Sequence, residues 1–177
     1  MGDLAVTTSP SSGSTGPPSQ SALVPLLTFD VGGRRFAVAA AAVREITLAV
    51  ATTPLPKAPP IVEGVIDVHG TLVPVLDIRR RFGLPPIPVA PEHHLLIAQA
   101  GRRVVALRVD HAIDLVSVNE DAIESAARVV PGVEFVAGIV KLPDGLTLIH
   151  DLDRFLSLEE AGQVAAATEA AARRTGR

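Results

Sequence analysis

Histidine and aspartate are the side chains of this sequence best suited to hold a metal ion. The candidate ligands are His93, His94, His111, His150, Asp151 and Asp153. Zinc takes imidazole nitrogens and carboxylate oxygens from ligands that converge on one point. Adjacent His93 and His94 would point to opposite faces of a strand, and no HxH or HxxxH pair occurs. We therefore expect no metal and no cofactor, and a His/Asp centre around His150 is the remaining basis for an enzyme.

Nucleophilic catalysis and phosphate binding have less support still. The part of the chain expected to fold offers Ser117, Ser125 and Ser157, none of them in a nucleophile-elbow sequence, and cysteine is absent. The glycine patterns GxGxxG and GxxxxGK that cradle phosphates do not occur. We predict that the protein is not an enzyme.

Charge and hydropathy exclude two further classes. The formal net charge is −3, and Arg79–Arg81, the densest basic run, is expected to line the solvent face of a helical turn. Such a chain offers no broad cationic face for nucleic acid. No stretch approaches the roughly 18 to 20 apolar residues that span a bilayer, and the first residues lack a signal-peptide pattern. Cytoplasm is the expected location.

Short apolar runs separated by turn residues predict a mostly β fold. Residues 1–24 are rich in Ser, Thr, Pro and Gly and are expected to form a disordered tail. Apolar runs flank Gly32-Gly33, which indicates a hairpin, and a short helical turn is expected over 40–46. Residues 52–60 contain too many prolines for a regular element.

The stretch GVIDVHGTLVPVLDI predicts a second hairpin. A two-residue turn at His69-Gly70 would pair Val68 with Thr71 and Ile66 with Val73. Histidine tolerates the left-handed backbone that such a turn requires.

Two parts of the chain repeat the same strand order. Gly64-Val65-Ile66 recurs as Gly138-Ile139-Val140, and Asp77-Ile78-Arg79-Arg80 recurs as Asp151-Leu152-Asp153-Arg154 at the same spacing. The two aspartates are expected to be N-caps of helical turns. Each half is too small for a large core, so the repeat predicts paired small barrels or curled sheets that share a hydrophobic seam.

The last segment predicts a helix. Ser157 and Glu160 have the spacing of a capping box, and an alanine-rich stretch follows over 159–177. Its apolar content is mostly alanine, so weak docking is expected.

Four stretches resemble the CheW-like coupling proteins of bacterial chemotaxis. They are FDVGGRRFAVAAAAVREI, TPLPKAPPIVEGVIDVHGTLVPVLDIRRRFGL, VVALRVDHAIDLVSV and GIVKLPDGLTLIHDLDRFL. The resemblance implies a CheW-like domain over 25–158, built from two five-stranded SH3-like barrels on a shared seam. We expect the first barrel over about 36–90 and the second over about 91–150, with strand exchange between them left open.

The resemblance also implies partners and two binding surfaces. A CheW-like protein joins the regulatory domain of a CheA-like histidine kinase to the cytoplasmic tip of a methyl-accepting chemoreceptor, which would hold it at the inner face of the membrane in receptor arrays. The receptor-binding residues implied here are Ala40, Val43, Glu45, His69, Val109 and Asp110. The kinase-binding residues implied here are Glu63, Gly64, Val65, Asp67 and Val75.

One position departs from the family. Where the family has Asn-Leu-Arg-Gly, this chain reads Asp67-Val68-His69-Gly70, so an imidazole that is mostly neutral at pH 7 replaces a permanent guanidinium. In the family that arginine lies close to a glutamate that matches Glu45. We expect altered receptor coupling, and the alternative function is a regulator that binds the kinase or another output protein without bridging to receptors.

Overall fold

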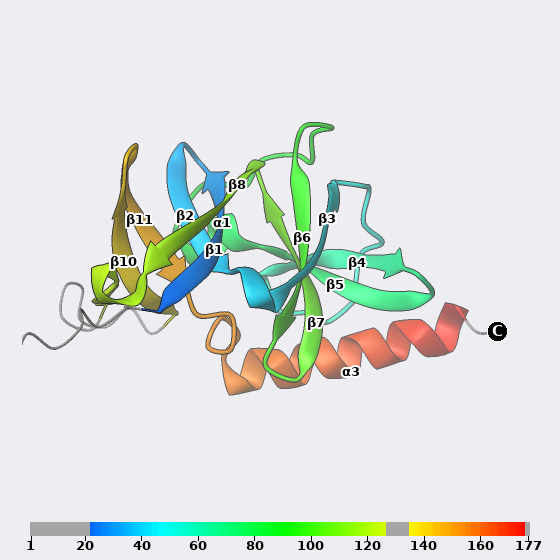
Figure 1. The fold of residues 1–177 in the computed structure, drawn as a ribbon. Coiled ribbons are helices and arrows are strands. Elements are labelled where there is room, and N and C mark those ends of the chain that lie inside the picture. Colours follow the sequence, from blue (N-terminus) through cyan, green and yellow to red (C-terminus); the bar gives the residue numbers. More distant parts are fainter. Residues whose placement is uncertain (1–21, 127–134, 176–177) are drawn as a thin grey trace, which may run out of the picture.

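The computed structural model describes residues 22–126 and 135–175, and it arranges their strands in two sheets (Figure 1). Sheet 1 has the order β8-β1-β2-β11-β10-β9 and sheet 2 the order β3-β6-β7-β5-β4. The strands of sheet 1 are β1 Leu23–Val31, β2 Arg34–Ala39, β8 His111–Asn119, β9 Glu124–Ser125, β10 Val136–Leu142 and β11 Gly145–His150. Those of sheet 2 are β3 Val43–Leu48, β4 Val62–Val68, β5 Thr71–Asp77, β6 His94–Ala100 and β7 Arg103–Val109.

Strand exchange, which the sequence left open, decides which strands share a sheet. Sheet 1 combines the first two strands of the chain with the last four, whereas sheet 2 holds the five strands between them. The expected barrels over 36–90 and 91–150 therefore each contribute strands to both sheets. Two parallel pairings join the halves, β2 with β11 and β5 with β7. Residues 1–21 of the expected tail lie outside the described residues, and β1 begins at Leu23.

The internal repeat appears as the same strand order in the two sheets. β1–β2 corresponds to β6–β7, and β4–β5 corresponds to β10–β11. Gly64 and Gly138 occupy matching bulges, where an added Cβ would lie 2.4 Å from the Thr53 carbonyl oxygen and 2.6 Å from Ile123 respectively. A crossing segment passes this close in both halves, which explains why both positions are glycine.

Most of the large buried side chains lie in the seam between the two sheets. Members from sheet 1 include Phe29 and Phe36, and members from sheet 2 include Leu96 and Leu107, all at 0 or 1% exposure. A smaller apolar cluster packs on the other face of each sheet. The expected shared seam is confirmed. Both faces of the central strands are apolar because one face packs in the seam and the other packs in the smaller cluster of its own sheet.

The hairpin at His69-Gly70 forms with the predicted register. Ile66 pairs with Val73, and Val68 pairs with Thr71. His69 has φ 52° and Gly70 has φ 83°, as a turn with two left-handed central residues requires. The backbone nitrogen of Gly70 donates to the Asp67 carboxylate over 2.6 Å, which fixes the turn further.

The helical turn expected over 40–46 is shorter than predicted. A 3₁₀ turn, η1, covers Ala40–Ala42, and β3 begins at Val43. The β-branched residues of this segment pair with β6 instead of continuing the turn, because cross-strand packing outweighs the helical preference of the alanines before them.

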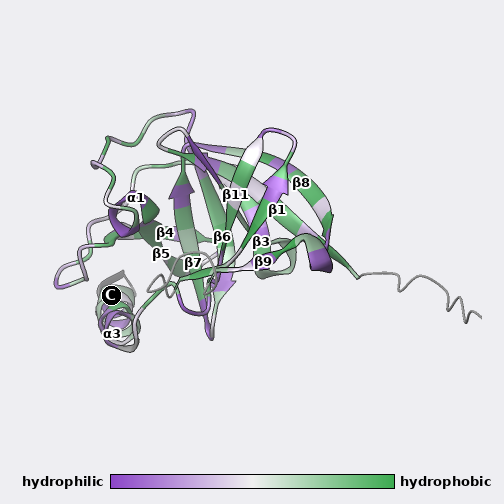
Figure 2. Ribbon diagram, turned by 90° about the vertical axis from the view of Figure 1, so that its left-hand side faces the viewer, coloured by the Kyte–Doolittle hydropathy of each residue, from purple (hydrophilic) through white to green (hydrophobic). Residues whose placement is uncertain are grey.

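The predicted C-terminal helix, α3, spans Leu158–Thr175 and lies along sheet 2, away from β1 and β8 (Figures 1 and 2). Its capping box is confirmed: the Glu160 nitrogen donates to the Ser157 hydroxyl, and the Ser157 nitrogen donates to the Glu160 carboxylate. Within residues 22–126 and 135–175, none of the helices has the length and apolar content that a bilayer crossing requires.

His150 lies in an aromatic cluster rather than among carboxylates. Its ring lies 4.8 to 6.2 Å from the rings of Phe36, Phe82, Phe135 and Phe155. Nδ1 lies 3.1 Å from the Phe135 carbonyl oxygen, whereas Nε2 is buried without a hydrogen-bond partner. Among the described residues, no group of three or more His, Cys, Asp or Glu side chains could hold a metal ion. The cluster assigns His150 a packing role.

Burial lowers the pKa of His150 to about 4, against the smaller opposing effect of its hydrogen bond to Phe135. The folded state therefore disfavours the imidazolium, and stability is fully present above pH 6.5 and is lost as the pH falls from 6.5 toward 4. From this linkage we expect wild-type protein to lose about 2 to 3 kcal/mol of unfolding free energy between pH 7 and pH 4.5 through this group.

His150→Phe should remove that component, measured by urea unfolding at the two pH values. His111→Phe is the control, because His111 is exposed and its replacement should leave the acid loss in place. An equal acid loss in wild type and His150→Phe would show that His150 does not set the acid sensitivity.

Candidate functional site

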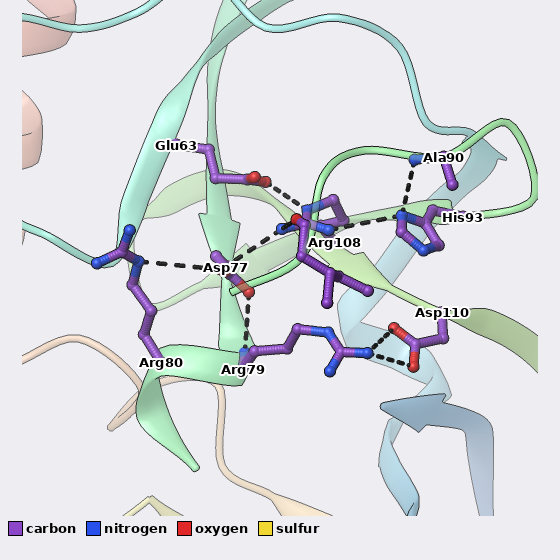
Figure 3. A network of polar contacts seen from close by, with 9 residues as sticks. Glu63, Asp77, Arg79, Arg80, Ala90, His93, Arg108 and Asp110 are labelled. Carbon is purple, nitrogen blue, oxygen red and sulfur yellow. Dashed lines mark hydrogen bonds and ion pairs between the residues drawn. The ribbon is translucent and has the colours of Figure 1, made fainter. Parts of the chain in front are cut away.

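A buried polar network lies at the junction of the two sheets (Figure 3). At its centre is Arg108, whose side chain is 3% exposed. Its Nε donates to Glu63 over 2.6 Å, and its Nη2 lies 3.4 Å from Asp77 and 3.3 Å from the Ile87 carbonyl oxygen. The network therefore ties β7 to β4, to β5 and to the proline-rich connector before β6.

A second part of the network joins sheet 2 to sheet 1. Arg79 lies in α1, Ile78–Arg81, and its Nη2 donates to both carboxylate oxygens of Asp110, over 3.0 and 2.8 Å. Asp110 also accepts a hydrogen bond from the backbone nitrogen of Gly32, in the turn between β1 and β2. Asp77 caps α1 as predicted, since its carboxylate accepts from the Arg79 nitrogen. Asp110 thus links the β1–β2 hairpin of sheet 1 to α1, which follows β5 of sheet 2.

The expectation that Arg79–Arg81 face solvent is wrong for two of the three residues. Arg79 is buried, with its side chain 9% exposed. Arg81 binds the Phe155 carbonyl oxygen and Glu160, and its guanidinium lies 5.4 Å from the centre of the Phe155 ring. Only Arg80 of this run, 49% exposed at its side chain, lies where the sequence placed it. The partners of Arg79 and Arg81 lie more than 30 positions away in the sequence, so the run itself did not indicate that these side chains are buried.

The burial of Arg108 was not predicted from the sequence, for a related reason. It stands between Leu107 and Val109, so alternation places it on the opposite face of the strand, where a charged side chain is expected to reach water. Glu63 and Asp77 cover that face instead. The sequence signal that could have indicated its burial was a single arginine between apolar residues of one strand.

The end strands β3 and β8 carry exposed apolar residues on the sides that face the seam. Ile46 pairs with Leu96, a seam residue, and Leu48 lies on the same side, with exposures of 43% and 59%. On β8, Leu115 pairs with the seam residue Leu27 and is 62% exposed. We call Ile46, Leu48 and Leu115 the seam edge. Exposed apolar side chains at the free edges of two sheets are typical of a protein-binding surface.

The six residues expected to bind a receptor fall in two places. Glu45 and His69 come together, with Oε2 and Nε2 3.3 Å apart, and this contact links the end strand β3 to the tip of the β4–β5 hairpin. Ala40 and Val43 shortly precede Glu45 in the sequence and are half-buried. Val109 is 1% exposed inside the seam, and Asp110 is held by Arg79.

The strand register separates the two groups. Val109 is in line with Leu48, at the opposite end of β3 from Val43. The Glu45–His69 contact and the Arg79–Asp110 pair are therefore not one cluster.

The five residues expected to bind a kinase divide between the two faces of the hairpin. Gly64 and Val75 pair with each other on the inner face and are buried. Val65 and Asp67 alternate onto the outer face, whereas the bulge at Glu63 interrupts the alternation and its carboxylate accepts from Arg108. Opposite them on β5, Pro74 pairs with Val65 and Leu72 pairs with Asp67. We call these outer-face residues, Val65, Asp67, Leu72 and Pro74, the hairpin face.

The fold and these exposed surfaces define the class of protein, which is a protein-binding module. Its buried polar network stabilises the structure. Residues 25–160 match the model of the CheW-like domain family. The chain belongs to the CheW-like family and is a chemotaxis coupling adaptor. The expected family resemblance is confirmed.

Individual relatives agree with this assignment. The chain is 32% identical over 137 residues to the chemotaxis protein CheW of Rhizobium meliloti, covering 76% of this chain and 88% of that protein. It is 31% identical over 141 residues to the chemotaxis protein CheW of Bacillus subtilis, covering 77% and 88%. The crystal structure of the scaffolding protein TtCheW from Thermoanaerobacter tengcongensis superposes with a TM-score of 0.71 at 24% identity, covering 77% of this chain and 94% of that one.

The Arg79–Asp110 pair gives a stability prediction. Asp110→Asn keeps the shape of the side chain but leaves the guanidinium of Arg79 buried without a countercharge. We expect the free energy of unfolding to fall by about 2 kcal/mol, measured as a lower urea midpoint at an unchanged slope. Glu92→Gln removes the same charge from an exposed site and should change stability by less than about 0.5 kcal/mol. Equal effects of the two substitutions would contradict a role for the pair in joining the sheets.

Proposed function

We propose that the protein is a non-catalytic adaptor that joins the regulatory domain of a CheA-like histidine kinase to the cytoplasmic tip of a chemoreceptor. The observation that carries the proposal is the seam edge, an exposed apolar surface on a domain of the CheW-like family. The described carboxylates of the polar network are engaged by arginines and backbone nitrogens, which suits a scaffold better than a catalytic site.

The receptor tip is assigned to the seam edge. An apolar stripe on a helix fits an apolar surface that lies between two packed sheets, and Ile46, Leu48 and Leu115 supply such a surface. Glu45 and His69 stand at its polar border, 45% and 83% exposed at their side chains. They would contribute orientation more than affinity, because exposed polar contacts are weak.

The kinase regulatory domain is assigned to the hairpin face. Asp67 offers a carboxylate beside Leu72, an arrangement that suits a partner with a mixed apolar and basic surface. The kinase and the receptor would thus contact different strands of sheet 2. The predicted location is the cytoplasm, at receptor arrays, where both partners of such an adaptor are found.

The alternative is a regulator that binds the kinase or another output protein but has lost its receptor end. The observation that favours it is His69, which replaces the arginine of the family. Titration calorimetry at fixed salt, first with the kinase regulatory domain and then with a receptor-tip fragment, separates the two. Binding to both supports the bridging adaptor, kinase binding alone supports the regulator, and binding to neither contradicts both.

Leu48→Asp tests the receptor surface. A carboxylate on the seam edge would have to lose its hydration against an apolar helix, so receptor-tip binding should weaken at least about tenfold. Kinase binding should not change, because Leu48 pairs with His94 and is not part of the hairpin face. Val89→Asp, at an exposed apolar residue of the connector, is the matched control and should bind both partners as wild type does. Equal loss in the two variants would remove the seam edge from the proposal.

His69→Arg tests the departure from the family. Arginine carries a permanent positive charge, and the imidazole that it would replace lies 3.3 Å from Glu45. Since both side chains are exposed, the gain in receptor-tip affinity should be modest, about two- to fivefold, measured by the same calorimetry. Unchanged affinity would refute the idea that His69 alters receptor coupling.

A further inference from the structure

α3 covers part of the surface that the proposed function gives to the kinase. Val65 of the hairpin face is 4% exposed and packs in one cluster with Ala167 of α3 and with Leu55 of the proline-rich segment. Pro74, which pairs with Val65 and shares its face, is also buried. Further along, Asp67 and Leu72 line a cleft together with Thr168, Glu169 and Ala172. The helix therefore lies over the hairpin face from Val65 toward the turn at His69-Gly70.

The contact between α3 and the hairpin face is built from small side chains. Val164 and Ala167 are buried and Ala171 is half-buried, at the spacing of one helical face. A buried alanine removes little apolar area from water, so each contact stabilises the docked helix only slightly. Past Ala167 the packing opens into a cleft of about 330 Å³ lined by Pro54, Pro56, Ala170 and Ala171, among others.

The first turn of α3 is held more firmly than the rest. Arg81 donates to Glu160 over 2.8 Å and to the Phe155 carbonyl oxygen over 2.7 Å. Burial acts to raise the pKa of Glu160, but the hydrogen bonds from Arg81 and Ser157 outweigh it, so its pKa lies below its usual value. A helix anchored at one end and lightly packed beyond it can leave the hairpin face without detaching from the domain.

The alanine content of α3 also favours the state in which the helix has left the hairpin face. It has the highest helix propensity, so α3 keeps much of its structure when it leaves sheet 2. Residues 161–175 also lie beyond the stretch that matches the family model, which ends at residue 160.

From these observations we propose that α3 is an intramolecular cover of the hairpin face that competes with the kinase regulatory domain. The proposal rests on the proposed function for the identity of the competing partner. Because the kinase binds only molecules whose hairpin face is free, its apparent affinity is reduced by the fraction of molecules in which α3 is undocked. Release of α3 would then raise kinase binding without altering any kinase contact.

Ala167→Glu is the variant that should release the helix. It places a carboxylate against Val65, and we expect the affinity for the kinase regulatory domain to rise about fivefold or more in titration calorimetry of the full chain. Ala166→Glu adds the same charge to the same helix at an exposed position and should bind as wild type does. Hydrogen exchange of the peptides that contain β4 and β5 should quicken in Ala167→Glu and not in Ala166→Glu. Unchanged receptor-tip binding shows that each variant is folded.

Ala171→Leu tests the opposite direction and does not challenge folding. A leucine at this half-buried site fills part of the cleft beside Pro54 and Pro56, so it should strengthen docking and weaken kinase binding. Kinase affinities that are equal in wild type, Ala167→Glu and Ala171→Leu would overturn the cover and leave the adaptor function standing. Weaker binding by Ala167→Glu alone would overturn it too, because α3 would then be part of the kinase interface. Absence of kinase binding in every variant would refute the assigned partner itself, whatever hydrogen exchange shows.

Discussion

The seam between the two sheets is the constraint on which the rest of the structure depends. Phe29, Phe36, Leu96 and Leu107 meet there from both sheets, and each sheet alone would expose these side chains to water. Because the first two strands pair with the last four, neither half of the chain can form its sheet without the other. Folding therefore requires contacts between residues far apart in sequence, which is typical of slow-folding β topologies.

The polar network follows from the same seam. Once the strands are exchanged, α1 after β5 lies against the β1–β2 turn, and Arg79, Asp110 and Gly32 form one hydrogen-bonded group there. Charged side chains can be buried at such a junction only where opposite charges and backbone nitrogens meet them. The network is thus better explained by the joining of the sheets than by catalysis, and the metal alternative at His150 fails on its aromatic surroundings.

The exposed surfaces are what the seam leaves uncovered. β3 and β8 end their sheets and keep Ile46, Leu48 and Leu115 in water, and the outer face of β4–β5 is shared between solvent and α3. An adaptor that meets two partners needs surfaces that do not overlap, and the seam edge and the hairpin face share no residue. In the proposed arrangement, regulation acts on one of these surfaces through a helix of small side chains.

Local chemistry was enough for the sequence by itself to determine the His69-Gly70 turn, the caps of α1 and α3, and the repeat. The His69-Gly70 register, the Asp77 cap and the Ser157–Glu160 box each depend on residues at most seven positions apart, so their spacing specifies them. The resemblance to the CheW-like family was likewise carried by ordered motifs. Tertiary structure alone decided which strands share a sheet, that Arg79 and Arg108 are buried, and that Val65 lies under α3. These features depend on partners 30 to about 100 positions away, and the side chain at one position carries no information on which distant residue will meet it.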